Sequence, residues 1–264
     1  PLLEEEDRQI VNEVPNEFKH IESIDFDHVW FSYDNNDVYA LEDFTLSIKA
    51  GEFIGIVGPS GSGKSTLLSL LMGLYKPTKG AIYINDIDIA NYDSSVLRHL
   101  MGYVFQQAYL FKGSIKDNLT LFDTSISFDD MVNAAKQVNL DSMIEQLPEG
   151  YNTPVGYLGS LLSDGQKQLL AFGRTLIRKT PILLLDEATA NIDSHTEKQI
   201  QASIENIRGT KTIVSIAHRL STVQDANKIV YMEYGKIIES GSFEELIDSK
   251  GAFYNLWSNQ QSGS

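Results

Sequence analysis

The segment of residues 58–65 constrains the fold more than any other part of the sequence. It follows a continuous apolar stretch at residues 53–57, typical of a strand buried on both faces, and it precedes an expected helix over residues 64–74. Glycines let such a loop curl so that its N–H groups face an anion, and the helix N-terminus adds partial positive charge. The sequence therefore predicts a phosphate-binding loop, whose contacts would be Gly58, Pro59, Ser60, Gly61, Ser62, Gly63, Lys64, Ser65 and Thr66.

Two side chains of this loop and two carboxylates further along the chain indicate what kind of phosphate-bearing ligand the loop binds. Lys64 is placed to reach the β- and γ-phosphates of a nucleoside triphosphate, and the Ser65 hydroxyl is placed to bind Mg²⁺. An apolar run at residues 182–185 ends in Asp186, which would bind Mg²⁺ through water, and Glu187, which would polarise the attacking water. Carboxylates after a strand are often helix caps. Beside a phosphate loop they instead indicate a nucleoside triphosphate site.

Apolar patterns elsewhere predict two kinds of β-structure. Alternation at residues 21–48 indicates an antiparallel sheet, and a hairpin is expected over residues 228–241, turning near Tyr234 and Gly235. Continuous apolar runs are typical of strands buried on both faces of a parallel sheet, and they occur at residues 53–57, 182–185 and 212–217.

A helical insertion interrupts this parallel sheet. Ser127 is a candidate N-cap with Asp130 three residues later, and apolar residues at helical spacing predict a helix over residues 127–140. The fold class is thus α/β: a P-loop NTPase core with a mixed parallel sheet, an antiparallel β subdomain and an inserted α-helical subdomain.

Composition excludes several other classes of protein. The 36 acidic residues against 21 basic ones give a formal net charge of −15, which disfavours nucleic acid as a partner. Because the chain contains no cysteine, it has neither a disulfide framework nor a thiolate metal site. No apolar run approaches the roughly 20 residues that span a bilayer.

Further segments resemble the motifs of ATP-binding cassette (ABC) proteins, in the order and spacing of that family. Residues 162–168 are similar to its signature sequence, residues 186–193 to its second carboxylate motif running into the D-loop, and residues 215–222 to its switch-histidine segment. Gln106 falls at the position of the Q-loop, and Tyr33 falls at the aromatic position. The resemblance extends from about residue 21 to the C-terminus.

This resemblance implies roles for residues outside the phosphate loop. Tyr33 would stack on adenine, Gln106 would bind Mg²⁺ or the attacking water, and His218 would contact the γ-phosphate. Catalysis would then rest on Glu187, His218, Gln106 and Lys64, and the metal would be held by Ser65, Gln106 and Asp186.

The resemblance also implies a partner. The signature donors of one subunit would face the phosphate loop of another, so the active unit would be a head-to-tail dimer of two nucleotide-binding domains with two ATP at the interface. Ser163 is expected to begin a helix, so that residues 163–166 offer N-terminal donors suited to a γ-phosphate. The residues that this chain contributes to its partner's site would be Ser163, Asp164, Gly165, Gln166 and Asp193.

Within the family, residues 113–118 and 217–222 resemble exporters rather than importers. Exporters carry membrane helices ahead of this domain. The resemblance therefore implies a linker remnant at residues 1–20 and a nucleotide-binding domain at residues 21–264, with the helical subdomain inserted at about residues 107–178. The complete protein would lie in the cell membrane, with this domain at its cytoplasmic face and its transmembrane domain outside this chain. The alternatives are the ATPase subunit of an importer and a soluble ABC ATPase without a transport function.

The signature region departs from the usual pattern. Asp164 stands where the family has glycine, and Tyr157 and Leu158 stand where exporters carry Glu and Arg. The catalytic positions, by contrast, keep their usual residues. This combination resembles the catalytically intact half of a heterodimeric multidrug exporter, and the alternative is a homodimer in which these positions have drifted without effect.

Overall fold

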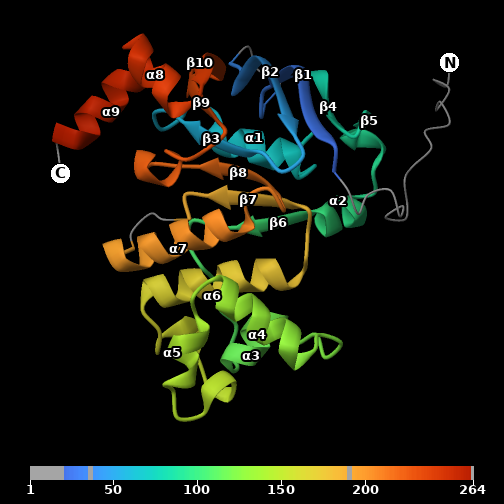
Figure 1. Ribbon diagram of the computed structural model, residues 1–264. Coiled ribbons are helices and arrows are strands. Elements are labelled where there is room, and N and C mark those ends of the chain that lie inside the picture. The colour runs from blue at the N-terminus through green and yellow to red at the C-terminus, as the bar shows by residue number, and fades with distance from the viewer. Residues whose placement is uncertain (1–20, 35–37, 189–191, 263–264) are drawn as a thin grey trace, which may run out of the picture.

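An antiparallel sheet with the strand order β2-β1-β4-β5 forms one side of the molecule (Figure 1). The structure is a computed structural model that describes residues 21–34, 38–188 and 192–262, so the predicted linker at residues 1–20 lies outside the described residues. The predicted antiparallel sheet is confirmed, and two strands that the sequence analysis did not identify extend it. Its strands are β1 (Ser23–Phe31), β2 (Leu41–Lys49), β4 (Lys79–Ile84) and β5 (Ile87–Asp88).

A six-stranded sheet with the order β10-β9-β3-β8-β7-β6 crosses the centre. Its strands run parallel except for β10, which pairs antiparallel with β9. Tyr234 and Gly235 join these two strands as predicted, and both have positive φ, as tight hairpin turns require. The strands are β3 (Phe53–Val57), β6 (Met101–Val104), β7 (Ile182–Asp186), β8 (Thr212–Ile216), β9 (Lys228–Glu233) and β10 (Lys236–Gly241).

The central sheet separates two hydrophobic cores. Side chains alternate across it, so Ile54 and Ile56 of β3 join the core beneath the antiparallel sheet, while Phe53 and Val57 join the opposite core. Helices α1 (Lys64–Leu71) and α2 (Ser94–Leu100) contribute to the first core. Figure 1 shows the predicted helical insertion below the opposite face of the sheet.

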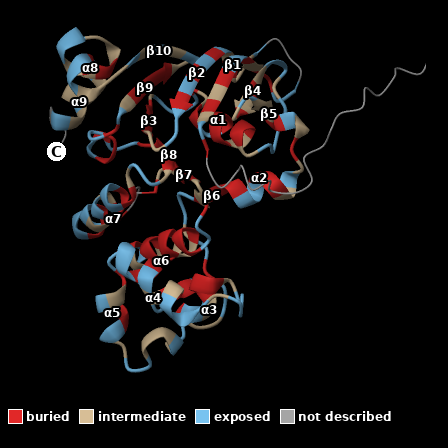
Figure 2. Cartoon of the chain, turned by 45° about the vertical axis from the view of Figure 1, so that its right-hand side comes forward, coloured by how far each residue is buried: buried red, intermediate tan, exposed pale blue. Residues whose placement is uncertain are grey.

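The opposite core is covered by helices that pack on one another. Figure 2 shows α6 (Asp164–Ile177) largely buried among them, with exposed residues on the outer faces of its neighbours. These neighbours are α3 (Ile115–Thr120), α4 (Phe128–Gln137), α5 (Asp141–Glu145) and α7 (Ser194–Ile207). The remaining helices are α8 (Phe243–Ser249), α9 (Ala252–Ser262) and the 3₁₀ turns η2 (Ile89–Asn91), η3 (Gly150–Asn152), η4 (Tyr157–Gly159) and η5 (Leu220–Thr222).

Two predicted helices are shorter in the structure than in the sequence analysis. The helix expected over residues 64–74 ends at Leu71, because Gly73 adopts φ 69° and turns the chain away. Ser127 caps α4 as predicted, but the left-handed Asn139 (φ 57°) follows its end and prevents continuation to residue 140. Over the described residues, no helix has the length and apolar character needed to cross a membrane.

Candidate nucleotide site

Most of the predicted site residues lie at one edge of the central sheet, where neighbouring parallel strands end. The register places both Ile56 of β3 and Asp186 of β7 opposite Ile216 of β8. The phosphate loop, the carboxylates and His218 therefore emerge from three adjacent strands, each about 4.8 Å from the next. In open α/β sheets this carboxyl-terminal edge is where ligands bind.

The phosphate loop has a conformation that only glycine permits at two points. Gly58 and Gly63 have φ values of 147° and 99°. A Cβ at Gly58 would lie 2.1 Å from the carbonyl oxygen of Met232, and one at Gly63 would lie 2.5 Å from that of Ala40. The loop is thus wedged against both sheets, which fixes the direction of its N–H groups.

Lys64 is enclosed by this loop. Its Nζ donates hydrogen bonds to the carbonyl oxygens of Gly58 and Pro59, both at 2.8 Å, and the residue is only 6% exposed. Burial lowers the pKa of the Lys64 ammonium, and the carboxylates of Glu187 and Asp186 partly oppose this shift. The ammonium is therefore a caged cation that can exchange carbonyl oxygens for phosphate oxygens.

Tyr33 lies beside the helix that follows the loop. Its hydroxyl forms a 3.0 Å hydrogen bond with Oγ1 of Thr66, and its ring packs edge-on against Phe31 and Tyr75. The side chain is still half exposed, so part of the ring remains accessible to a ligand.

Glu187 and His218 are in direct contact. Oε1 of Glu187 lies 2.6 Å from Nε2 of His218, and the glutamate side chain is 14% exposed against 48% for the histidine. Glu187 has φ 49°, which an L-residue adopts at an energetic cost and which is frequent at functional sites. The pair can hold and accept a proton at the mouth of the phosphate loop.

Asp186 has a partner that the sequence analysis missed. Tyr103 of β6 pairs with Leu184 of β7, so Asp186 stands diagonally opposite on the same face, and the Tyr103 hydroxyl donates to Oδ2 of Asp186 at 2.7 Å. Burial, together with this hydrogen bond, raises the pKa of Tyr103, so the phenol stays a donor. Only the register of β6 against β7 could have revealed this contact.

The predicted metal ligands have the right chemistry for Mg²⁺. The hydroxyl of Ser65, the amide of Gln106 and the carboxylate of Asp186 all offer oxygen, the donor that Mg²⁺ prefers. The described residues contain no cluster of three or more His, Asp or Glu side chains able to hold a metal alone. An ion at this edge would therefore depend on nucleotide phosphates, as Mg²⁺ usually does.

Gln106 lines a hollow that is not lined by Ser65 or Asp186. Within the described residues no hydrogen bond joins Gln106 to Ser65, Asp186 or Glu187; the hollow has a volume of about 350 Å³ and is also lined by Asp164. The buried Gln168 of α6 donates to the carbonyl oxygen of Phe105 at 2.8 Å, so the segment that carries Gln106 is fastened to the helical insertion.

The signature residues begin α6, as the sequence analysis expected of Ser163. Ser163 and Gln166 form a reciprocal capping box, and Asp164 is exposed and paired with Lys167 at 2.9 Å. A Cβ at Gly165 would lie 2.4 Å from Oγ1 of Thr196 in α7, and that hydroxyl donates to Asp193 at 2.7 Å. Residues 163–166 and Asp193 thus lie together. Helices α6 and α1 cover opposite faces of the sheet. Within one chain, residues 163–166 therefore lie apart from the phosphate loop, which leads into α1.

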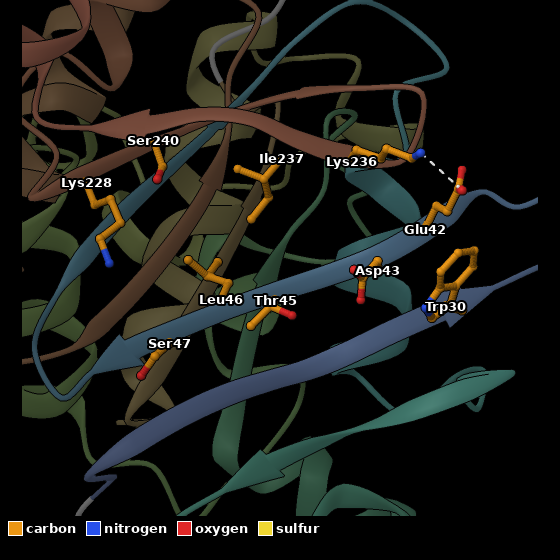
Figure 3. A pocket seen from close by; sticks show the side chains of 10 residues that line it. All are labelled: Trp30, Glu42, Asp43, Thr45, Leu46, Ser47, Lys228, Lys236, Ile237 and Ser240. Atoms are coloured by element: carbon orange, nitrogen blue, oxygen red, sulfur yellow. Dashed lines mark ion pairs between the residues drawn. The ribbon is translucent and has the colours of Figure 1, made fainter.

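A separate hollow of about 520 Å³ lies between β2 and β10 (Figure 3). Lys236 and Glu42 form a 3.1 Å ion pair across its rim. None of the predicted site residues lines it. This hollow is therefore distinct from the candidate nucleotide site.

The fold and the phosphate loop define a P-loop NTPase. The family model for ABC transporters matches residues 41–190, and the chain belongs to the ABC transporter family. That match includes the phosphate loop, the signature and the carboxylate motif.

Of three similar proteins, two are named for export and one is named as an ABC transporter protein. A Streptococcus pneumoniae protein named as an ABC transporter ATP-binding protein is 44% identical over 90% of this chain and 40% of its own length. A Staphylococcus aureus protein named as a multidrug export ATP-binding/permease protein is 41% identical over 98% of this chain and 45% of its own. A solved bacterial Atm1-family ABC exporter with ATP bound superposes with a TM-score of 0.85 and 37% identity, over 96% of this chain and 44% of that one. The chain thus spans less than half of these relatives and matches the ATP-binding part of exporter-type proteins, which favours the exporter interpretation over the two alternatives.

Proposed function

We propose that this chain is the Mg²⁺-dependent ATP-hydrolysing domain that powers substrate export by an ABC transporter, at the cytoplasmic face of the cell membrane. The observation that carries the proposal is the convergence of a caged lysine, a tyrosine-held aspartate and a glutamate–histidine pair at the ends of three adjacent strands. Each has the chemistry that phosphoryl transfer to water requires.

Within this proposal each residue has one role. Tyr33 stacks on adenine, the N–H groups of the phosphate loop and Lys64 bind the phosphates, and Glu187 accepts a proton from the attacking water while His218 orients the γ-phosphate. Ser65, Asp186 and Gln106 would hold Mg²⁺, which supplies charge neutralisation of the phosphates. The segment that carries Gln106 is fastened to α6, so Gln106 would link the metal to the helical insertion.

The proposal is tested by measuring phosphate release from ATP with Mg²⁺ and after chelation by EDTA. We expect turnover to fall to background with EDTA and to return on addition of Mg²⁺. Binding is followed separately with a fluorescent ATP analogue, whose affinity should also fall when Mg²⁺ is removed. Hydrolysis that is unaffected by EDTA would contradict the proposed metal ligands.

The separation of the two phosphate-facing elements supports a dimer. Residues 163–166 form the N-terminus of α6, and helix N-termini attract anions, but they lie with the core opposite to the phosphate loop. A second nucleotide-binding domain, turned head to tail, would bring its signature to the loop of this one. No nucleic acid is needed for this assembly, in keeping with the net charge of −15.

The surface near Gln106 supports a docking site for the transmembrane part. Phe105, Tyr109 and Leu158 are large apolar side chains and each is more than half exposed. Tyr109 and Leu158 line the same hollow as Gln106. Exposed apolar residues gathered in this way mark interaction surfaces, and the link from Gln168 to Phe105 would transmit movement between that surface and α6.

We further propose that the dimer is asymmetric, with Asp164 in the weaker of its two sites. Asp164→Gly, measured as ATPase activity of the full assembly, is expected to change turnover less than about twofold. The carboxylate is exposed and already paired with Lys167, and the partner site that it faces would lack a catalytic base. Asp164→Asn, which removes the charge but keeps the shape, should behave in the same way. A large rise in turnover with either variant would instead indicate a homodimer with two equal sites inhibited by Asp164.

A further inference from the structure

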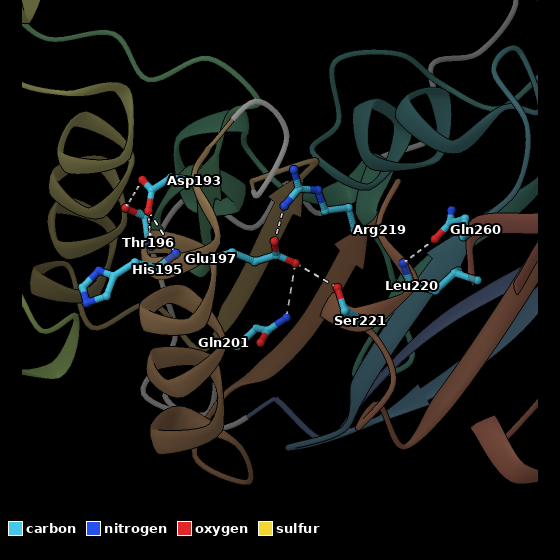
Figure 4. Close-up of polar contacts among 9 residues, drawn as sticks. All are labelled: Asp193, His195, Thr196, Glu197, Gln201, Arg219, Leu220, Ser221 and Gln260. Carbon is cyan, nitrogen blue, oxygen red and sulfur yellow. Dashed lines mark hydrogen bonds and ion pairs between the residues drawn. The ribbon is translucent and has the colours of Figure 1, made fainter. Parts of the chain in front are cut away.

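The residues that follow β8 are attached to the C-terminal helix. Gln260 of α9 donates its Nε2 to the carbonyl oxygen of His218 at 2.7 Å. Figure 4 shows its second contact, in which Oε1 accepts from the N–H of Leu220 at 3.2 Å. One side-chain amide thus binds both backbone groups that flank Arg219. We call residues 218–221 the histidine segment.

A second helix holds the same segment from another side. Glu197 of α7, whose side chain is 11% exposed, forms an ion pair with Arg219 and accepts a hydrogen bond from Oγ of Ser221 at 2.8 Å (Figure 4). Successive residues of the histidine segment therefore bind alternately to α9 and α7. Because Asp193 is the N-cap of α7 and Thr196 of α7 lies beside Gly165, this helix also contacts the signature region.

The position of α9 is itself fixed at its other end. Glu239 of β10 accepts hydrogen bonds from the N–H groups of Ala252 at 2.6 Å and Phe253 at 3.1 Å. Phe253 is fully buried and packs in a T-shaped arrangement with Phe243, with the two ring centroids 5.9 Å apart. The start of α9 is therefore anchored to β10, and Gln260 near its other end binds the histidine segment.

His218 lies just beyond the end of β8, so its position depends on contacts outside the sheet, including the one with α9. The last ladder hydrogen bond of β8 runs from the N–H of Ala217 to the carbonyl oxygen of Ile56 at 3.1 Å. The His218 side chain is 48% exposed, so packing alone does not fix its ring. Its carbonyl oxygen is held by Gln260, and its ring meets Glu187.

We propose that Gln260 is a positioning residue of the ATP site: through the His218 carbonyl it aims the imidazole at Glu187, so full turnover requires docked α9. The inference rests on the proposed ATPase function. Misplacement of a reacting group by about 1 Å can cost about 10²-fold in rate.

The test replaces Gln260 by Ala and by Leu in the full-length protein. Both residues favour helix, so α9 is retained, and Leu also keeps most of the side-chain volume. We expect kcat to fall about tenfold in both variants while KM and ATP affinity stay within about twofold of wild type. Gln261→Ala is the matched control, because Gln261 is the adjacent residue and exposed, and it should retain wild-type turnover.

A spectroscopic measurement separates positioning from general stability. In the 264-residue chain the imidazole NMR signal of His218, assigned by its loss in His218→Ala, should shift in both Gln260 variants and not in Gln261→Ala. Normal kcat in Gln260→Leu, an unshifted imidazole signal, or equal losses in kcat and ATP affinity would each overturn the inference. A wild-type protein without ATPase activity would refute the proposed function instead, and the imidazole signal would still decide whether Gln260 positions His218.

Discussion

Replacement of Glu187 by Gln is expected to lower kcat for ATP hydrolysis by about 10²-fold or more while ATP binding survives. The amide has the shape of the carboxylate and can still meet Nε2 of His218, which lies 2.6 Å from Oε1, but it cannot accept a proton from water. The left-handed backbone at Glu187 (φ 49°) suits neither residue better, so the substitution adds no new strain. The measurement is steady-state phosphate release beside titration with a fluorescent ATP analogue.

The matched control for this variant is Glu149→Gln. Glu149 is exposed at the start of η3, in the helical insertion and away from the sheet edge, so the same chemical change there should leave turnover unaltered. Near-normal hydrolysis by Glu187→Gln in the assembled transporter would show that another group acts as the base.

Locally determined features were predictable from the sequence. The phosphate loop, the buried strands, the N-caps at Ser127 and Ser163 and the turn at Tyr234 and Gly235 were all expected, and the structure contains each of them. These features depend on residues close together in the chain, where glycine, a capping hydroxyl or an apolar run leaves few alternatives.

Contacts between distant segments were not predictable in the same way. The hydroxyl of Tyr103 reaches Asp186 because β6 lies beside β7 in a particular register, and Gln260 reaches His218 because α9 folds back from β10. Neither residue belongs to a short motif. Such partners become visible only when the order of strands and the course of the last helix are known.

The arrangement at the sheet edge explains why one chain brings the proposed catalytic groups together but does not place its own signature residues beside them. The groups proposed to break the phosphate bond meet at the ends of β3, β8 and β7. The signature donors at Ser163, by contrast, lie with α7 beside Asp193. A single chain would therefore bind ATP from one side, and hydrolysis would depend on closure by a second domain.

Lys64 is held by polar groups of the phosphate loop itself. Its Nζ donates to two carbonyl oxygens of the loop at 2.8 Å and lies 3.4 Å from Oγ of Ser62. In the proposed function, nucleotide binding would exchange these contacts for charge-assisted hydrogen bonds to phosphate oxygens, which contribute about 1.5–3 kcal/mol each. Burial lowers the pKa of the Lys64 ammonium, and the carboxylates of Glu187 and Asp186 oppose this shift and so favour the charged form.

Lys64→Ala is therefore expected to weaken ATP binding by about 10- to 100-fold, the range that one lost charge-assisted hydrogen bond predicts. Hydrolysis at low ATP should fall at least as far, because the same cation stabilises charge in the transition state. Isothermal titration with Mg²⁺ and ATP measures the affinity, and thermal unfolding shows whether the loop survives without its cation. Lys136→Ala is the control, since Lys136 is exposed on α4 and should leave the affinity unchanged. Unchanged ATP affinity in Lys64→Ala, with the fold intact, would mean that residues 58–66 do not bind the phosphates.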